Sequence, residues 1–367
     1  MSKIIKGIYK DINKNIIGII IPSFNNQGTI KRCLDSVERV KKNKNFIFYC
    51  VCIDDFSNDK TREILIEYNK KKVVDKIICN KSNKGISASR NIGIRICDKT
   101  DWIMFLDADD QLIDEFNIKN SILNPKYSQI IFSHISIKKN QENIKHHFIN
   151  NISLSKSMII DYLFKYFSIP NKFSLFNSCW GRLFNTKIIL SDKVSLFNEK
   201  MNTSEDVDFT LKTLLKNPRC YYIRNVIYKH YESIYFRPML SASIARKKSD
   251  LDLFGFIWAV RTAKMIILKY SKKTQIFNLN QKIYHCLSAY FIIYFIRSTL
   301  RIYSINTLFK TFKTIRNVSN HEYFRKCFKY YNPKKAQGNK LIFLLIKYKM
   351  ISFAYLYGFY IAFKRYK

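Results

Sequence analysis

Short, continuous apolar runs alternate with amphipathic segments along the first third of the chain. The runs cover residues 16–21, 46–53, 73–79 and 102–106. Between them, apolar residues recur three and four positions apart, the spacing of one buried helical face, over residues 28–41, 60–68 and 85–97. A buried parallel strand shows as a continuous apolar block. The alternation therefore predicts an α/β fold with a mostly parallel sheet, flanked by helices and joined by right-handed crossovers.

The later pattern predicts one further strand and then helices. A helix is expected at 207–215 and a strand at 221–228, and helical spacing continues from about Ser249. Residues 350–363 carry no charge, and this segment is too short to span a bilayer but suits a helix lying in its interface. A terminal helix packed on its neighbours, or a dimer contact, is the alternative. With no run of eighteen apolar residues and no recognisable signal peptide, we expect neither a spanning helix nor secretion.

The positive charge of the chain is concentrated in its last third. Of a formal net charge of +37, residues 241–367 carry +22, from 25 Lys and Arg against 3 Asp and Glu. Basic clusters mixed with aromatic residues suit an anionic lipid surface, although nucleic-acid binding would produce the same pattern and a merely well-solvated surface is a further alternative. We favour lipid. Nine cysteines without a Cys-x-x-Cys pair fit small core residues in a reducing compartment. We therefore expect a cytoplasmic protein that binds a membrane surface through this basic, aromatic-rich region.

The largest acidic cluster follows the fourth predicted strand. It holds Asp107, Asp109 and Asp110, and the second predicted strand likewise ends in Asp54 and Asp55. Ligands of α/β sheets collect beyond the carboxyl ends of the strands, and close carboxylates repel one another unless a cation joins them. Carboxylates suit Mg²⁺ or Mn²⁺, with substrate phosphates completing the shell. The cluster thus predicts a divalent metal and a diphosphate, and an acidic turn that opens a helix is the alternative.

The sequence leaves open which of the three acids faces a metal. Side chains alternate along an extended strand end, which places Asp107 and Asp109 on one side and Asp110 on the other. A turn beginning at Ala108 would bring Asp110 round to the first side. Asp109 and Asp110 are therefore both candidate metal ligands.

Four short motifs occur in a fixed order: Ile-Pro-Ser-Phe-Asn at 21–25, Ile-Asp-Asp-Phe-Ser-Asn-Asp at 53–59, Gly-Ile-Ser-Ala-Ser-Arg-Asn-Ile-Gly at 85–93 and Phe-Leu-Asp-Ala-Asp-Asp at 105–110. Together they resemble the nucleotide-sugar-binding half of the family 2 glycosyltransferases with the GT-A fold. Two further motifs, at 179–184 and 204–209, resemble acceptor-side motifs of bacterial members that build surface polysaccharides.

The resemblance covers about residues 16–235 and implies a domain organisation. A GT-A domain would occupy 1–240, with a nucleotide-binding half at 16–123 and an acceptor half at 124–240. The basic helical C-terminal region would follow at 241–367.

The resemblance also implies which residues form the base pocket of the donor site. Pro22, Phe24 and Asn25 would belong to the nucleotide site, with Pro22 and Phe24 lining the pocket. Asp55, ahead of Asp54, would accept a hydrogen bond from the uracil imide. The alternative for either acid is a helix-capping turn.

On the phosphate side, the same resemblance places Arg90 near the uracil or the phosphates, with a surface ion pair as the alternative. Asp107 would contact the ribose or a metal-bound water. Asp109 would bind the metal, with Asp110 as its rival. His230 is a further candidate for the metal or diphosphate, although a half-buried, hydrogen-bonded histidine is the favoured interpretation.

An inverting transfer also needs a base that takes the proton of the acceptor hydroxyl. The resemblance favours Asp206, with Glu205 second, at the start of a predicted helix. A capping box formed by Thr203 and Asp206 is the alternative. Trp180 with Gly181 would form an apolar floor for the acceptor sugar, and a core role for Trp180 is equally expected.

The sequence is thus interpreted as an inverting, Mn²⁺- or Mg²⁺-dependent glycosyltransferase. It would move a hexosyl or N-acetylhexosaminyl group from a nucleotide sugar, most simply a UDP-sugar, to a glycan or lipid-linked glycan of a capsule, O-antigen or lipooligosaccharide. We expect a peripheral position on the inner face of a bacterial membrane, no nucleic-acid partner and a possible homo-oligomer. The alternatives are a Mg²⁺-dependent nucleotidyltransferase or phosphatase, and a non-catalytic basic protein that binds membrane or nucleic acid.

Overall fold

The structure is a computed structural model of the chain. It describes residues 14–113, 116, 118–138, 141–169, 173, 175–192, 196–201, 203–231, 253–272, 276–299, 312–313, 315–317, 319–334, 339–354, 356–357 and 360.

The chain divides into two compact units that alternate along the sequence. Unit 1 comprises residues 1–153, 180–196 and 219–234, and unit 2 comprises residues 154–179, 197–218 and 235–367. Each unit is therefore built from separate stretches of chain. The expected boundary at residue 240, with its two halves before it, stays a prediction.

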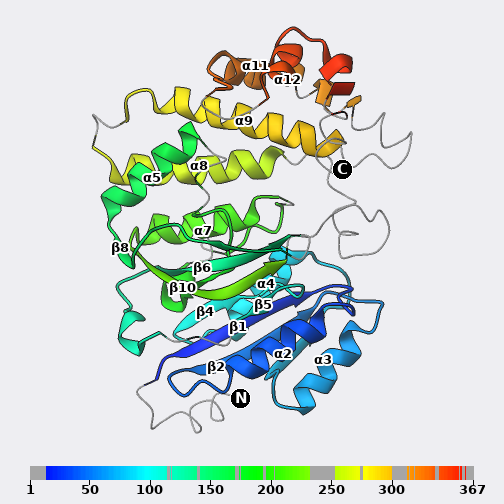
Figure 1. Cartoon of the computed structure of the whole chain (residues 1–367), viewed down its shortest axis with the longest axis vertical. Helices are drawn as coiled ribbons and strands as arrows, with labels where there is room; N and C mark the ends of the chain where they lie inside the picture. The colour runs from blue at the N-terminus through cyan, green and yellow to red at the C-terminus, as the bar shows by residue number, and fades with distance from the viewer. Residues whose placement is uncertain are drawn as a thin grey trace. The chain divides into compact units, whose positions relative to one another are not determined.

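In the described part of the chain, unit 1 is organised around a ten-stranded sheet (Figure 1). Its main path runs in the order β3-β2-β1-β4-β9-β6-β10-β5, with β7 paired to β6 and β8 to β10. The first four strands on this path are parallel, and β6 with β10 is a further long parallel pair. The strands are β1 (Ile16–Ser23), β2 (Ile47–Asp54), β3 (Lys76–Cys79), β4 (Trp102–Phe105), β5 (Gln111–Leu112), β6 (Gln129–Lys138), β7 (Gln141–Lys145), β8 (Ile152–Leu154), β9 (Arg182–Asn185) and β10 (Cys220–Tyr231). The predicted α/β fold with a mostly parallel sheet is confirmed.

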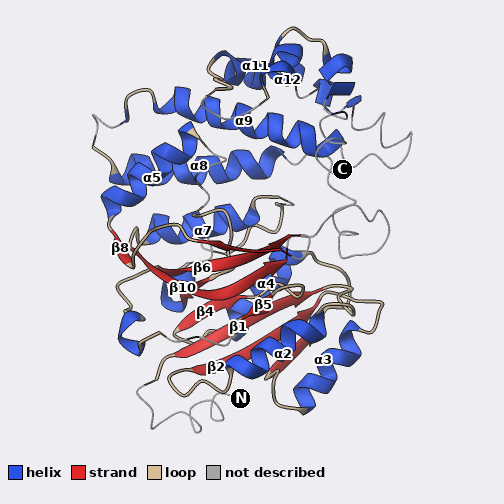
Figure 2. Ribbon diagram, in the orientation of Figure 1, coloured by secondary structure: helices blue, strands red, loops and turns tan. Residues whose placement is uncertain are grey.

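Helices connect the parallel strands, as the alternating pattern predicted (Figure 2). The apolar face of α2 packs with Ile19 and Ile21 of β1 in one buried cluster. Ile20 points to the other face, where it meets Gly93. Helices α2 and α4 therefore cover opposite faces of the sheet, which is what right-handed crossovers require when the chain returns from β3 past β1 to β4. The helices of this unit are α2 (Ile30–Val40), α3 (Thr61–Lys70), α4 (Ile86–Ile96) and the short α6 (Thr186–Ile189).

Two glycines let α4 and the segment after it approach β1 closely. A Cβ atom on Gly93 would lie 2.4 Å from Cγ2 of Ile20, and one on Gly18 would lie 2.8 Å from Sγ of Cys97. Only glycine fits such a contact without moving its neighbours. These two close contacts hold α4, the helix that carries Arg90, against the sheet.

Unit 2 is helical in its described part. The side chains of Phe291, Phe324, Phe328 and Ile346 share one buried cluster. Its helices are α5 (Lys156–Ser168), α7 (Glu205–Lys216), α8 (Leu253–Tyr270), α9 (Leu279–Thr299), α11 (Glu322–Lys329) and α12 (Lys340–Lys347). The predicted helical C-terminal region is thus confirmed over the described residues, while part of the segment 350–363 lies outside them.

The cysteines and the helices test two further expectations. All nine cysteines are free; eight are buried and Cys79 is half-buried, which confirms their role as core residues. Within the described part of the chain, no helix combines the length and apolar character needed to cross a membrane.

Replacing Gly93 with alanine is expected to destabilise unit 1. The added methyl group overlaps the side chain of Ile20, and overpacking of this kind costs about 1–3 kcal/mol. Urea unfolding followed by circular dichroism measures the loss. Gly28→Ala is the matched control, because a Cβ there meets no atom within 4 Å. Equal unfolding midpoints for the two variants would contradict the close contact between α4 and β1.

Candidate active site

The acidic turn directly follows β4 at the centre of the sheet. The N–H of Leu106 still donates to the carbonyl oxygen of Ile20, so pairing with β1 continues to the edge of the turn. The N–H of Asp110 then donates to the carbonyl oxygen of Asp107, at 3.0 Å, and closes the turn. Asp107, Asp109 and Asp110 therefore project from one tight turn, at the carboxyl end of a buried strand.

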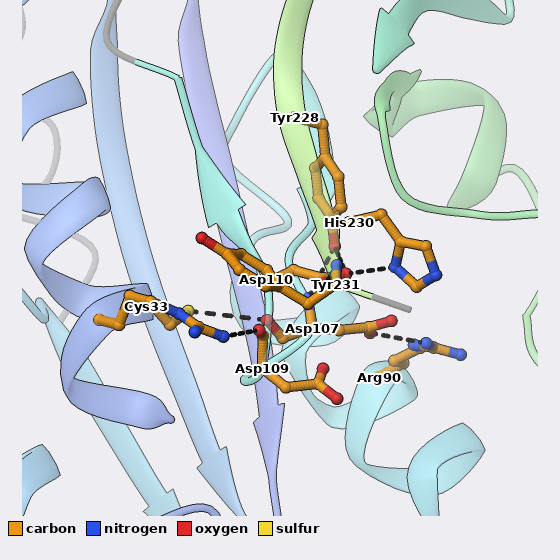
Figure 3. A network of polar contacts seen from close by, with 9 residues as sticks. Cys33, Arg90, Asp107, Asp109, Asp110, Tyr228, His230 and Tyr231 are labelled. Carbon is orange, nitrogen blue, oxygen red and sulfur yellow. Dashed lines mark hydrogen bonds and ion pairs between the residues drawn. The ribbon is translucent and has the colours of Figure 1, made fainter. Parts of the chain in front are cut away.

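The Asp110 carboxylate is buried against the end of β10. It accepts hydrogen bonds from Oη of Tyr228 at 2.7 Å, from Nδ1 of His230 at 3.0 Å and from the N–H of Tyr231 at 2.8 Å. Burial raises its pKa, and the bond to His230 opposes that rise. Figure 3 shows this carboxylate turned toward the β10 side chains. Asp110 therefore ties the turn to β10.

The hydrogen bond to Asp110 determines the state of the His230 ring. Burial alone would lower the pKa of His230, but the bond to Asp110 and the nearby charges of Asp110, Asp107 and Asp109 raise it. An ionised carboxylate only accepts, so Nδ1 carries the proton that it donates. The half-buried, hydrogen-bonded histidine favoured by the sequence is therefore what the structure contains.

Asp107 is paired with a buried arginine on α4. Nη2 of Arg90 lies 3.0 Å from Oδ1 of Asp107, and the arginine side chain is only 1% exposed. The N–H of Asp107 donates to Oη of Tyr228. Arg90 is thus not in a surface ion pair; its guanidinium lies beside the acidic turn at the end of β4.

The Asp109 side chain extends away from the Asp110 cluster, toward the side on which Asp107 meets Arg90 (Figure 3). No other described residue donates a hydrogen bond to its carboxylate. Burial, followed by the charges of Asp110 and Asp107, raises the pKa of Asp109 to about 6. The surroundings of Asp109 therefore disfavour the ionised form of its carboxyl group. A bound cation would favour that form instead.

These residues fit a divalent cation that the substrate helps to hold. Asp107 and Asp109 offer hard oxygen ligands from one turn, and the charge of Asp109 is uncompensated by any described donor. Among the residues that the structure describes, no group of three or more His, Cys, Asp or Glu is arranged to hold an ion by itself. Mg²⁺ and its relatives commonly use one or two carboxylates together with substrate phosphates.

The acids after β2 organise the neighbouring loops. Asp55 accepts from Nδ2 of Asn80 and from the N–H groups of Lys84 and Gly85, at 2.8–2.9 Å. These bonds hold the turn at the start of α4. Asp54 is buried and accepts from the N–H of Ser57 at 3.4 Å. Both acids thus have partners in loops, and each keeps further acceptor capacity for a nucleotide.

The loops after β1 and β2 lie together and expose an aromatic ring. Pro22 is buried at the end of β1, and Phe24 is half-buried. Oδ1 of Asn25 accepts from the N–H of Asn58, which joins the two loops. Phe56 follows Asp55 with φ of 69° and a ring that is 56% exposed. A bulky residue in this left-handed conformation carries backbone strain, which is typical of ligand-binding loops.

Trp180 lies in an aromatic cluster of unit 1. It forms a parallel bridge with Phe105, stacks on Tyr228 and His230 at centroid distances of 5.0 and 4.7 Å, and meets the edge of His134. The ring is half-buried. The contacts with Tyr228 and His230 link Trp180 to the cluster around Asp110.

His134, which meets Trp180, is neutral at neutral pH, and Gly181, which follows Trp180, has a left-handed backbone conformation. Burial, followed by the charges of His147 and His230, lowers the pKa of His134 to about 3. Gly181 has φ of +66°, a conformation that favours glycine. Whether Trp180 and Gly181 bind an acceptor stays a prediction.

Glu205 and Asp206 begin α7 in unit 2. The N-cap is Ser204, which has φ of 59° and makes no side-chain cap bond, so the helix begins one residue later than the proposed capping box of Thr203 would require. Oδ1 of Asp206 accepts from Sγ of Cys179 at 3.3 Å.

The start of α7 is braced by α8. Oγ1 of Thr262 donates to Oδ1 of Asp208 at 2.7 Å, and Gly255 allows α8 to approach the carbonyl group of Thr203. Asp206 is therefore mounted on a braced helix start.

The residues predicted for the nucleotide-sugar and metal site all lie in unit 1. Beside the acidic turn the structure also places Tyr228, the N–H of Tyr231 and Arg32, whose Nη2 donates to the carbonyl oxygen of Asp109 at 2.6 Å. None of these three was predicted. The period-two spacing of Tyr228 and His230 at a strand end was the available signal. Glu205 and Asp206 belong to unit 2.

A family model described as glycosyl transferase family 2 matches residues 18–189. That range includes β1 to β4, the acidic turn, Arg90 and Trp180. Residues 18–189 belong to glycosyltransferase family 2.

Curated relatives match the chain over part of their length. A poly(ribitol-phosphate) beta-glucosyltransferase of Bacillus spizizenii is 29% identical over 205 residues, which cover 54% of this chain and 30% of that protein. The uncharacterized glycosyltransferase EpsJ of Bacillus subtilis is 32% identical over 95 residues, or 26% of each chain. The chain spans 26–40% of the length of the curated relatives that it matches.

Solved structures share the fold of the chain. Residues 1–349 of Staphylococcus aureus TarS, in complex with UDP-GlcNAc, match with a TM-score of 0.61 and 16% identity, over 94% of this chain and 90% of that one. The same segment of TarS without a named ligand gives a TM-score of 0.57. At this identity the likeness concerns the fold, and the predicted GT-A fold class is confirmed.

Replacing Asp109 with asparagine is expected to stabilise the metal-free protein at neutral pH. The folded-state pKa of about 6 lies above the ordinary value of 3.8, so ionisation of Asp109 costs folding free energy as the pH rises from about 4 to 6. The variant should gain roughly 1–3 kcal/mol at pH 7.5 in EDTA, and the gain should vanish near pH 4. Urea unfolding at both pH values measures it.

Asp98→Asn is the control, because Asp98 is exposed beside Lys99. Its stability should stay within about 0.5 kcal/mol of the parent. If Asp109→Asn is no more stable than the parent at pH 7.5, ionisation of Asp109 does not lower the free energy of unfolding.

Proposed function

We propose that the chain transfers a sugar from a UDP-sugar to a hydroxyl group of a bacterial surface glycan, with inversion at the anomeric carbon. The observation that carries this proposal is the turn at the end of β4. There, Asp107 pairs with the buried Arg90, and the Asp109 carboxylate accepts no hydrogen bond from another described residue. A nucleoside diphosphate with a divalent cation supplies the charges that this arrangement lacks. Membership of residues 18–189 in family 2 supports the same reaction.

The donor half of the proposed site uses the acids at two neighbouring strand ends. A bound Mn²⁺ or Mg²⁺ would act as a Lewis acid on the leaving diphosphate. Asp109 and Asp107 would hold it, and Arg90 would fix Asp107 in place. Asp55 would accept from the base, with Pro22 and Phe24 beside it.

The acceptor half would supply the base. Asp206 would take the proton of the attacking hydroxyl as its oxygen forms a bond to the anomeric carbon, while the bond from that carbon to the diphosphate oxygen breaks and UDP leaves. The sulfur hydrogen bond from Cys179 and the bracing of α7 by α8 support a fixed carboxylate at this position. Glu205 is the second candidate, and Trp180 with Gly181 would contact the acceptor sugar.

The names of similar proteins support the substrate class. The Bacillus spizizenii relative is a glucosyltransferase acting on poly(ribitol-phosphate), and the TarS structure contains UDP-GlcNAc. We therefore propose a hexosyl or N-acetylhexosaminyl donor and an acceptor of the capsule, O-antigen or lipooligosaccharide type. A lipid-linked acceptor would place the enzyme at the cytoplasmic surface of the membrane.

Binding of UDP is expected to depend on a divalent cation and on Asp109. Isothermal titration with UDP should show affinity about tenfold or more higher with Mn²⁺ than with EDTA, because the cation joins carboxylate and diphosphate. Asp109→Asn should abolish this difference, and Asp98→Asn should keep it. A screen of UDP-, GDP- and dTDP-sugars for nucleotide release identifies the donor.

Two results would change the assignment. If no nucleotide sugar is turned over and UDP binds equally well with and without metal, the proposed glycosyltransferase activity is wrong. If Asp109→Asn keeps the metal effect and Asp110→Asn alone loses it, the metal role passes to Asp110.

Replacing Asp206 with asparagine is expected to lower sugar transfer by about 10²–10⁴-fold, because an amide cannot accept the hydroxyl proton. Its affinity for UDP with Mn²⁺ should equal that of the parent. Transfer of labelled sugar to a glycan fraction measures turnover, with Glu205→Gln as the neighbouring control. Near-normal transfer by Asp206→Asn would exclude it as the base.

A further inference from the structure

Exposed apolar side chains are concentrated near the end of the chain. Of eighteen large apolar side chains that are exposed in the described residues, six fall within the twenty positions 341–360. They are Leu341, Tyr348, Met350, Phe353, Leu356 and Tyr360. Single exposed apolar residues are normal on a protein surface, but such a concentration marks an interaction site.

The last helical segment places apolar residues on its buried and on its exposed side, where Ser352 is also exposed. Ile351 and Ala354 are buried in the same cluster as Ile342 and Ile346 of α12. Phe353 and Leu356 are 60% and 68% exposed. Because the buried side chains fix how the segment is rotated, the exposed ones form a defined stripe of unit 2.

The stripe is flanked by basic residues. Lys347 and Lys349 are exposed immediately before it, and Lys364 and Arg365 follow it in the sequence. Residues 319–367 hold eleven Lys and Arg against one acid, Glu322. An exposed apolar stripe with basic residues on both sides of it in the sequence is complementary to an anionic bilayer, which offers acyl chains beneath negative headgroups.

We propose that Phe353, Leu356 and Tyr360, with Lys347 and Lys349, form a docking surface for an anionic lipid bilayer. The apolar side chains would insert at the level of the headgroups, and the lysines would lie against lipid phosphates. Tyr348 and Tyr360 suit this depth, because their rings are apolar and their hydroxyl groups stay hydrated. The segment lies on the surface, which agrees with the lack of a spanning helix among the described residues.

This docking surface is independent of the transfer reaction, because vesicle binding is measured without a donor. A surface for a second copy of the chain would be apolar too, but the basic residues next to the stripe would then repel those of the other copy. Nucleic acid would match the charge and leave Phe353 and Leu356 without a partner. The bilayer is the occupant that uses both features.

Co-sedimentation of the full chain with vesicles tests the proposal. We expect binding to vesicles of phosphatidylglycerol and phosphatidylcholine, and about tenfold or more weaker binding to phosphatidylcholine alone. The double variant Phe353→Gln with Leu356→Gln should lose at least about tenfold in affinity for the anionic vesicles. Lys347→Gln with Lys349→Gln should lose about fivefold for each lysine, and added salt should weaken the parent similarly.

The matched control is Trp258→Gln with Met265→Gln on α8. Both side chains are 48% exposed, on the same unit and outside the stripe. The control should bind as the parent does, and circular dichroism and UDP binding should be unchanged in every variant.

Three outcomes would overturn the proposal. The first is that the parent ignores anionic vesicles. The second is that the stripe variant still binds, or loses no more than the α8 control. The third is that the stripe variant dissociates an oligomer in sedimentation velocity while vesicle binding persists, which would assign the stripe to a second copy.

Discussion

The buried carboxylate of Asp110 connects the turn after β4 to the end of β10, and these two segments meet at the candidate site. Asp110 accepts from a hydroxyl, an imidazole and a backbone N–H, all from the last four residues of β10. A buried carboxylate with these three donors removed would be an uncompensated charge, so the turn and the strand stabilise each other. The turn holds Asp107 and Asp109, and β10 holds Tyr228 and His230, on which Trp180 stacks. The positions of the donor-side acids and of the aromatic cluster therefore depend on one interaction.

The same turn divides three like charges between different environments. Asp110 is compensated by β10 and Asp107 by Arg90, which leaves Asp109 with a raised pKa. A protein selected only for stability would not keep that third acid, because its ionisation opposes folding. A carboxyl group with a strongly raised pKa, in a region where the other charges are paired, is typical of a ligand-binding site. The strained backbone at Phe56, beside Asp55, follows the same rule at the neighbouring strand end.

Much of unit 1 was predictable because its physics is local. Continuous apolar runs gave β1 to β4 to within a few residues, and the spacing of Ile30, Leu34 and Val37 gave α2. Strand parity could not decide how the three acids are oriented, because Asp107 to Asp110 form a closed turn and not an extended strand end. The partners of Asp110 were beyond reach, because they lie about 120 positions away on a strand with two irregularities in its pairing with β6, around Val226. Those irregularities change which β10 side chains share a face, and no periodicity in the sequence reveals them.

The helical unit shows where hydrophobicity stops being informative. In the last segment, Ile351 and Ala354 are buried whereas Phe353 and Leu356 are exposed, although the larger pair would gain more from burial. A pattern read by hydrophobicity alone gives one uncharged stretch and cannot separate core from surface within it. The separation comes from the packed cluster of unit 2, which includes Ile342 and Ile346 of α12 and buries only one side of the segment. The proposed bilayer surface, with acyl chains beneath anionic headgroups, would accommodate both these exposed apolar residues and the flanking lysines.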